Sequence, residues 1–242
     1  MNVVFNLPDR YKTDVKVALK DFIPKDLSPN DKKRIKDAVK EVRLVYQIAG
    51  EEIPSVIDTT YRCQAIQFFD IEVADIKDAQ FLASTYQNLI KPYCVIHMHD
   101  SKNEVYSFAV KRLNQQIENE IVIEESLVTE KYPMNLPDES RNRLLAYMDF
   151  LSVKNKQDKV ALYKEWYGKA YLLANEKVYD KVQLILDGNF WYDTDRTARV
   201  LGKYAQLIEA RAGLKKATGN ADRMKVNKLI KTAIADLNSE EF

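Results

Sequence analysis

The chain has 242 residues, of which 46% are apolar and 30% charged, with only 6 glycines and 7 prolines. This composition permits a buried core and excludes a low-complexity chain, and no apolar run approaches the roughly 18 residues that a membrane helix needs. The N-terminus lacks the basic and apolar regions of a secretion signal. Because both cysteines, Cys63 and Cys94, lie in strand-like runs, we expect a cytoplasmic protein with reduced thiols.

A helical pattern covers residues 28–49. Ser28 can cap the first free amide groups, Pro29 suits the first turn, and Gly50 supplies a stop. The apolar residues of this stretch recur at steps of three and four, at Ile35, Val39, Val42, Val45 and Ala49. The sequence therefore predicts a single helix with one apolar face.

Strand signals follow this helix. Residues 62–73 form an apolar run, and residues 93–112 contain two such runs joined by a polar four-residue turn, which is typical of a hairpin. Between them, residues 76–90 carry apolar side chains at helical spacing and end before Pro92. Residues 119–131 fit a further strand, although their pattern leaves the element type open. We expect a sheet with helices on at least one face.

After about Pro133 the pattern becomes helical. Helices are expected over residues 138–152 and 157–176, then from about residue 194 to 211, and from about residue 220 onward. Two prolines within residues 132–137 mark a boundary. We therefore predict an α+β fold, with an α/β-like sheet domain over residues 1–133 and an all-helical domain over residues 134–242.

Metal-ligand residues cluster at one place, His97 to Asp100. Alternate residues of a strand share a face, so His97 and His99 would point the same way and could share an ion with Asp100. No further metal-binding motif accompanies them. We interpret the pair as two histidines on one face of a hairpin strand, so no metal is predicted, and keep a metal site at His97 and His99 as the alternative.

Carboxylates offer a second candidate chemistry. Asp70 and Glu72 share a strand face and, with Asp58, resemble the acids that hold magnesium in nucleases of the restriction-endonuclease-like fold. The lysine expected two residues after the acid is replaced by Ala74. The sequence also lacks a nucleophile elbow, a phosphate-binding loop and a dinucleotide fingerprint. We therefore expect neither a catalytic residue nor a cofactor, with catalysis by Asp58, Asp70 and Glu72 as the alternative.

Positive charge is concentrated near the C-terminus. Residues 196–242 hold ten Lys and Arg against five Asp and Glu, whereas the net charge of the whole chain is +1. Such a segment attracts phosphate or an acidic partner, although solvated helix faces are also commonly basic. The predicted nucleic-acid contacts are Arg196, Arg199, Lys203, Arg211, Lys215, Lys216, Arg223, Lys225, Lys228 and Lys231.

Aromatic residues recur at helical spacing in the helix expected over residues 157–176. They are Tyr163, Trp166, Tyr167 and Tyr171. Such a stripe is typical of a core, but the chain has 14 tyrosines, and Tyr and Trp are enriched at interfaces. The hypothesis that these four residues form a partner interface therefore stands beside the core interpretation.

Several short motifs resemble an uncharacterised bacterial and archaeal family, domain of unknown function 4391. They are I-P-K at 23–25, V-R-L-V-Y-Q-I at 42–48, I-Q-F-F-D-I-E-V at 66–73, K-P-Y at 91–93, Y-C-V-I-H-M-H at 93–99 and Y-S-F-A-V-K at 106–111. The resemblance implies genes that often lie beside helicases, DNA methyltransferases and restriction subunits in defence regions. It transfers no catalytic residue.

These observations together favour a protein without catalytic activity. We expect an accessory or adaptor subunit of a bacterial anti-phage defence or restriction-like complex, which docks on a larger partner such as a helicase or nuclease. Its basic C-terminal helices would contact DNA or RNA. The alternative is a metal-dependent nuclease of degenerate restriction-endonuclease-like type.

Overall fold

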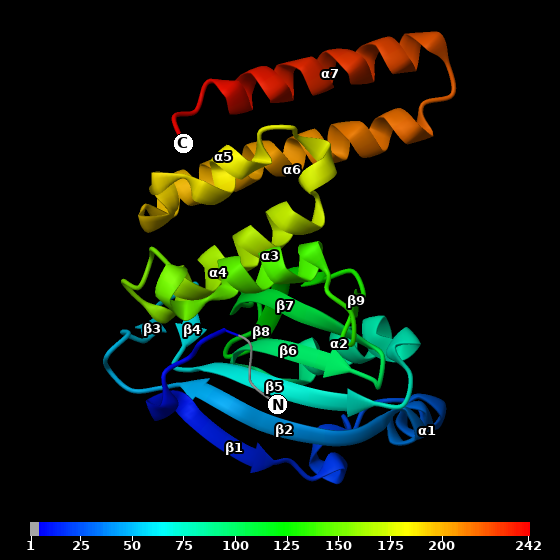
Figure 1. Cartoon of the computed structure of the whole chain (residues 1–242), viewed down its shortest axis with the longest axis vertical. Coiled ribbons are helices and arrows are strands. Elements are labelled where there is room, and N and C mark those ends of the chain that lie inside the picture. The colour runs from blue at the N-terminus through cyan, green and yellow to red at the C-terminus, as the bar shows by residue number, and fades with distance from the viewer. Residues whose placement is uncertain (1–4) are drawn as a thin grey trace. The chain divides into compact units, whose positions relative to one another are not determined.

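The structure, a computed structural model, describes residues 5–242 and has an α+β fold (Figure 1). The four residues before Phe5, on which part of the expectation about secretion rests, lie outside it. The chain forms two compact units, one up to Ala170 and one from Tyr171 to Phe242. The sequence placed the division at 133/134. The difference arises because the helices after residue 133 pack against the sheet as far as Ala170, as described below.

The first unit is built on a mixed sheet. Its strands lie in the order β1 (Lys12–Lys16), β2 (Val39–Ile48), β5 (Ile66–Val73), β6 (Tyr93–His99), β7 (Asn103–Leu113) and β8 (Ile121–Val128), while β9 (Tyr132–Pro133) also pairs with β7. Strands β3 (Val56–Ile57) and β4 (Arg62–Cys63) form a separate two-stranded sheet. β5 and β6 run parallel, and α2 (Ala79–Leu89) connects them, as a crossover connection requires. The predicted hairpin at 93–112 is confirmed, and residues 119–131 do contribute a strand.

The predicted single helix over residues 28–49 is wrong in its second half. Ser28 accepts a hydrogen bond from the Asp31 amide and begins α1 (Pro29–Ala38), but the chain then continues directly as β2. Residues Val42, Leu44, Tyr46 and Ile48 alternate as a strand requires, and the β-branched valines favour extended backbone. The backbone of β2 pairs with β1 on one side and with β5 on the other, so its amide and carbonyl groups have hydrogen-bond partners at both edges.

One face of the sheet is covered by α1 and α2. Here the odd-numbered residues of β5 and the even-numbered residues of β6 meet the apolar sides of both helices. The buried side chains include Phe69, Ile71, Val73, Ile96, Met98, Ile35, Leu82 and Tyr86. This layer is an apolar core, and Asp70 and Glu72 of β5 and the two histidines of β6 alternate with its residues and face the other way.

The opposite face is covered by α3 (Glu139–Met148) and α4 (Lys159–Ala174), joined by the 3₁₀ turn Phe150–Ser152 (Figure 1). The ring of Trp166 lies edge-on to that of Phe68, with centroids 5.6 Å apart. The hydroxyl of Tyr163 donates to the carbonyl of Cys94 at 2.7 Å. These contacts fasten α4 to β5 and β6.

Both edges of the sheet are charged and irregular. All five residues of β1 are exposed, and they include Lys12, Asp14 and Lys16. At the other edge, β8 exposes Glu124 and Glu125. The pairing of each edge strand with its neighbour also contains a register shift.

The second unit is helical. It contains α5 (Val182–Asp187), α6 (Thr194–Lys216), α7 (Asn220–Asn238) and the 3₁₀ turns Glu176–Val178 and Asn189–Tyr192. The long helices α6 and α7 form a hairpin whose buried residues include Tyr204, Leu207 and Leu237 (Figure 1). The side chain of Asp193 caps α6 by accepting from the Arg196 amide. Across residues 5–242, no helix combines the length and apolar character that crossing a bilayer demands.

Candidate functional site

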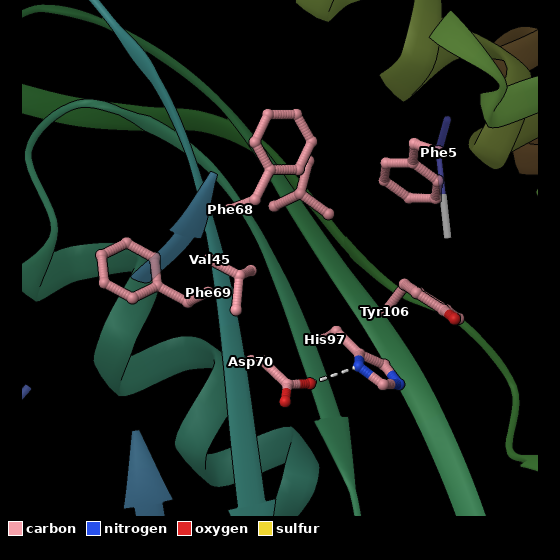
Figure 2. Close-up of a pocket in the computed structure, with 8 residues that line it drawn as sticks. Phe5, Val45, Phe68, Phe69, Asp70, His97 and Tyr106 are labelled. Atoms are coloured by element: carbon pink, nitrogen blue, oxygen red, sulfur yellow. Dashed lines mark hydrogen bonds and ion pairs between the residues drawn. The ribbon is translucent and has the colours of Figure 1, made fainter. Parts of the chain in front are cut away.

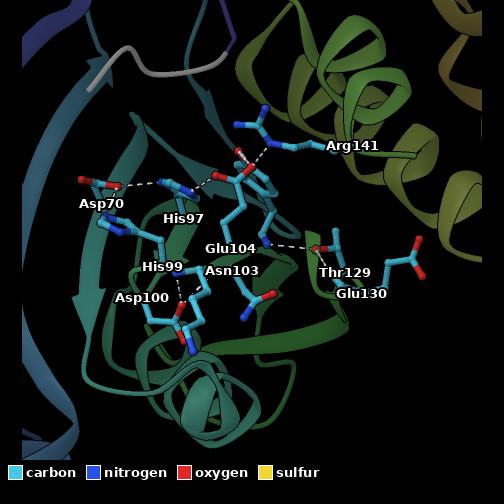
Figure 3. A network of polar contacts seen from close by, with 11 residues as sticks. Asp70, His97, His99, Asp100, Asn103, Glu104, Thr129, Glu130 and Arg141 are labelled. Atoms are coloured by element: carbon cyan, nitrogen blue, oxygen red, sulfur yellow. Dashed lines mark hydrogen bonds and ion pairs between the residues drawn. The ribbon is translucent and has the colours of Figure 1, made fainter. Parts of the chain in front are cut away.

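A polar cluster lies on the α3–α4 face of the sheet (Figure 3); it consists of five side chains from the strands, Asp70, His97, His99, Glu104 and Tyr106, and of Arg141 from α3. Asp70 on β5 pairs with His97 on β6, and His97 pairs in turn with Tyr106 on β7. His99, two residues along β6, pairs with Glu104 on β7. Because the strand register places these residues side by side, three neighbouring strands contribute to one cluster toward the carboxyl ends of β5 and β6.

His97 lies between two carboxylates (Figure 3). Its Nδ1 is 2.6 Å from Oδ1 of Asp70, and its Nε2 is 3.0 Å from Oε2 of Glu104. Nε2 of His99 is 3.5 Å from the same Asp70 oxygen. The imidazoles of His97 and His99 stack with centroids 5.1 Å apart. Both histidines therefore converge on one oxygen of Asp70.

Glu104 is almost fully buried and is fixed by further contacts. Its Oε1 accepts a hydrogen bond from the hydroxyl of Tyr106 at 3.1 Å and another from Nε of Arg141 on α3. The ring of Tyr106 stacks on the His97 imidazole at 4.8 Å. A buried charge is tolerated only when it is paired and hydrogen-bonded, and Glu104 meets that condition.

These contacts shift the acid–base equilibria of the cluster. Burial pushes the pKa of Asp70 upward, but hydrogen bonds from His97 and His99 outweigh it and hold the pKa well below its usual value. Burial likewise opposes ionisation of Glu104, yet His97 and Arg141 lower its pKa to about 2. Burial alone would lower the pKa of His97, but the hydrogen bonds and charges of Asp70 and Glu104 raise it by more, so its pKa lies above the usual value. The cluster therefore favours a cation held between two ionised carboxylates.

A small cavity adjoins the cluster (Figure 2). Asp70, His97 and Tyr106 line it together with apolar side chains, and its surface is mostly apolar; the apolar side chains are Phe5, Val45, Phe68, Phe69 and Val95. Its volume of about 20 Å³ is enough for one water molecule. The cavity therefore leaves room for no more than a very small ligand beside Asp70 and His97.

The structure brings together only some of the carboxylates and histidines singled out in the sequence. Within residues 5–242, the group able to hold a metal ion consists of Asp70, His97 and His99, with one ligand atom from each within 4.8 Å of the others. Glu72 instead pairs with Lys40 at 3.2 Å and is half-exposed. Asp58 accepts hydrogen bonds from two backbone amides in the β3–β4 turn. Asp100 accepts from the amides of residues 76, 102 and 103.

Three residues of the cluster, Glu104, Tyr106 and Arg141, did not stand out in the sequence as site residues. The only available signal for Glu104 was its place directly after the turn of the hairpin, where it must pair with His99. Arg141 reaches Glu104 from α3, 37 residues further along the chain. Only the packing of α3 on the sheet reveals that contact.

The aromatic stripe of α4 lies mostly inside the protein. Tyr163, Trp166 and Tyr167 are buried, and Nε1 of Trp166 donates to the carbonyl of Met148 at 3.0 Å. Tyr171 is partly buried. The four residues for which we predicted a partner interface therefore form no exposed aromatic surface, and their helical spacing directs them mostly into the core.

The ten predicted nucleic-acid contacts all lie on α6 and α7, and they divide into two groups. The first three are engaged within the second unit: Arg199 and Lys203 pair with Glu240 at 3.3 and 2.6 Å, and Arg196 donates to the carbonyl of Glu241. The other seven are exposed, and within the described chain no ion pair joins them to an acid. We call these seven the distal cations: Arg211, Lys215, Lys216, Arg223, Lys225, Lys228 and Lys231.

Comparison with known proteins identifies a family. No curated protein and no solved structure gives a match to this chain. A family model described as "Domain of unknown function (DUF4391)" matches residues 5–237. Because this match covers nearly the whole sequence, both the sheet and the helical unit are part of the family's domain. The chain belongs to that family.

Proposed function

We propose that this protein is a non-enzymatic accessory subunit of a bacterial anti-phage defence or restriction-like complex, and that it contacts nucleic acid through the distal cations. The observation that carries the proposal is the concentration of seven exposed, unneutralised cations at one end of a helical hairpin. Phosphate contacts from Lys and Arg supply most of the sequence-independent affinity for nucleic acid.

The hairpin places these cations on adjacent stretches of two helices. Arg211, Lys215 and Lys216 occupy the last turns of α6, and the other four lie on the first twelve residues of α7. Gly213 of α6 lies against Val226 of α7, so the two stretches face each other across the hairpin. Asp222 is the only acid on these stretches, and Glu209 lies just before them. The summed potential of the distal cations therefore favours a polyanion.

The defence context and the larger partner rest on the family. The resemblance of the motifs implies neighbours such as helicases and restriction subunits, and the whole-chain family match supports applying that implication to both units. We also propose a cytoplasmic location, which the two buried free thiols support. The partner can be identified by purifying the tagged protein from its host and sequencing what accompanies it.

The nuclease alternative receives less support from the geometry. Two-carboxylate sites that hold magnesium need both acids directed at one ion. Of the three acids considered, Asp70 alone belongs to the polar cluster, while Glu72 pairs with Lys40. Incubation with plasmid DNA or RNA in Mg²⁺ or Mn²⁺ is the direct test, and cutting that is lost in Asp70→Asn would restore this alternative.

Fluorescence anisotropy with labelled single-stranded DNA, duplex DNA and RNA tests the nucleic-acid contact. The test variant replaces Lys215, Lys216, Arg223 and Lys225 by Gln. The control variant removes the same charge from exposed lysines of the first unit, at Lys20, Lys25, Lys33 and Lys36. For duplex DNA, losing four phosphate contacts should reduce the slope of log K against log salt by roughly 3 to 4.

We expect binding at 50 mM salt that weakens steeply by 200 mM, and we expect the test variant to bind at least tenfold more weakly than the control variant. Equal weakening of the two variants would show that net charge alone matters and would contradict an interface on the hairpin. Undetectable binding of the unaltered protein to all three nucleic acids at 50 mM salt would remove the nucleic-acid part of the proposal.

A further inference from the structure

We propose that Asp70, His97 and His99 bind a divalent transition-metal ion of the zinc class. This site is separate from the distal cations, and its argument does not depend on nucleic-acid binding. Imidazole nitrogens and a carboxylate oxygen are the ligands that Zn²⁺ takes in proteins, and two histidines with one carboxylate also suit Fe²⁺.

The ligand atoms of the three residues all lie within 4.8 Å of one another. Zinc bonds of about 2.0 to 2.2 Å in tetrahedral geometry place neighbouring ligand atoms roughly 3.3 to 3.5 Å apart. Nε2 of His99 is 3.5 Å from Oδ1 of Asp70, which fits, and Nδ1 of His97 is 2.6 Å from the same oxygen. An ion would replace the proton shared by Nδ1 of His97 and Oδ1 of Asp70. A side-chain shift of under roughly 1 Å would increase the distance between these two atoms to the required value.

The surroundings of His97 match those of a metal-bound histidine. Such a histidine usually donates its other ring N–H to a carboxylate, which fixes the tautomer and the orientation of the ring. With Nδ1 on the ion, Nε2–H of His97 donates to Glu104 at 3.0 Å. Glu104 is held in turn by Arg141 and Tyr106. Glu104, fixed in this way, therefore gives the His97 imidazole a buried and rigid partner.

Charge and space also suit a divalent ion. Once His97 is neutral, Asp70 and Glu104 carry two negative charges against the single positive charge of Arg141, so an added cation meets a net negative cluster. The three side chains leave a fourth coordination position without a protein ligand among the residues described. The cavity of about 20 Å³ beside Asp70 and His97 has room for one water molecule, and a bound ion would supply the polar contact that its mostly apolar lining lacks. We therefore expect an open site, with water as the exchangeable ligand.

Metal titration of the full chain tests the proposal. The protein is freed of any affinity tag, stripped with a chelator, dialysed, and titrated with Co²⁺ and Zn²⁺. We expect one equivalent of either ion per chain, a visible Co²⁺ absorption typical of four- or five-fold coordination, and displacement of Co²⁺ by Zn²⁺. Asp70→Asn and His99→Gln should abolish the Co²⁺ absorption, and Glu104→Gln should weaken binding by about 10- to 100-fold.

Glu72→Gln is the matched control, since it removes a carboxylate from the same face of β5 that pairs with Lys40 and is not one of the three ligands. It should bind the ion as the unaltered protein does. Circular dichroism establishes that each variant is folded. A folded, unaltered protein that takes up neither Co²⁺ nor Zn²⁺ overturns the proposal, whatever the variants do. Binding reduced equally by Glu72→Gln and Asp70→Asn would also overturn it, because the ion would then be held by general negative charge.

Discussion

Replacing Trp166 by Ala should destabilise the first unit by about 4 kcal/mol, because large aromatic side chains cost about 3 to 5 kcal/mol when truncated in a core. The indole is 0% exposed, and its ring lies 5.6 Å from that of Phe68 and 6.0 Å from that of Phe5. Its N–H donates to the carbonyl of Met148, and leaving that carbonyl unpaired adds about 1 kcal/mol to the cost of truncation. Trp166→Phe keeps a ring and should lose about half as much.

Urea unfolding followed by circular dichroism measures the effect. For a slope of about 2 kcal/mol per molar urea, a loss of 4 kcal/mol lowers the midpoint of the first unit by roughly 2 M. The chain has two tryptophans. In the variant, Trp191 of the second unit is the remaining one, and its fluorescence follows residues 171–242 separately. A midpoint shift under about 0.5 M would refute the assignment of Trp166 to the core.

Three further results follow from other buried groups of the first unit. The buried ammonium of Lys159 donates to the carbonyls of Gly50 and Ile53. Lys159→Met should therefore lower the free energy of unfolding by about 1 to 3 kcal/mol and make the loop after Gly50 open to proteolysis after Glu51. Digestion at an unchanged rate would contradict this role. Glu165 pairs with buried Lys169 at 2.5 Å. Glu165→Leu should therefore lower the free energy of unfolding in urea by about 3 to 5 kcal/mol. A smaller loss would mean that Lys169 finds another partner. Burial raises the pKa of the Cys63 thiol to about 12 and also raises the pKa of the Cys94 thiol. Neither thiol should therefore react with a disulfide reagent at pH 8 until the protein is denatured. Rapid labelling of the native protein would show that one of them is accessible.

The sequence predicted the strands β5, β6 and β7 and left β8 open, but it gave no signal for β1 and β9 and indicated a helix where β2 lies. Val39, Val42 and Val45 satisfy the helical steps of three and four, yet Val42, Leu44 and Tyr46 equally satisfy the alternation of a strand. Local pattern cannot separate these two interpretations. What decides between them is the pairing of β2 with β1 and β5, which lie far from it in the sequence.

The polar cluster was predictable in the same partial way. That His97 and His99 share a face follows from strand periodicity alone, and the structure confirms it. Asp70 joins them only because β5 and β6 are parallel neighbours in a register that sets Asp70 beside His97. Such register depends on the α2 crossover and on the apolar layer beneath it, which no short motif encodes.

The burial of two lysines was not predictable from sequence. Lys111 and Lys159 lie inside the first unit, although lysine is rarely fully buried. Each donates to backbone carbonyls of loops that precede it in the chain. Their burial follows from where those carbonyls end up after folding.

The charged, bulged edges of the sheet bear on how copies of this protein meet. An unguarded outer strand presents free amide and carbonyl groups that recruit an identical strand, and repeated addition grows a fibre. On β1 an incoming strand would meet the ammonium groups of Lys12 and Lys16 and a backbone whose register is broken. These features discourage edge-to-edge pairing of sheets from two molecules at high protein concentration. Replacing Lys12 and Lys16 by threonine should therefore promote fibrous precipitation.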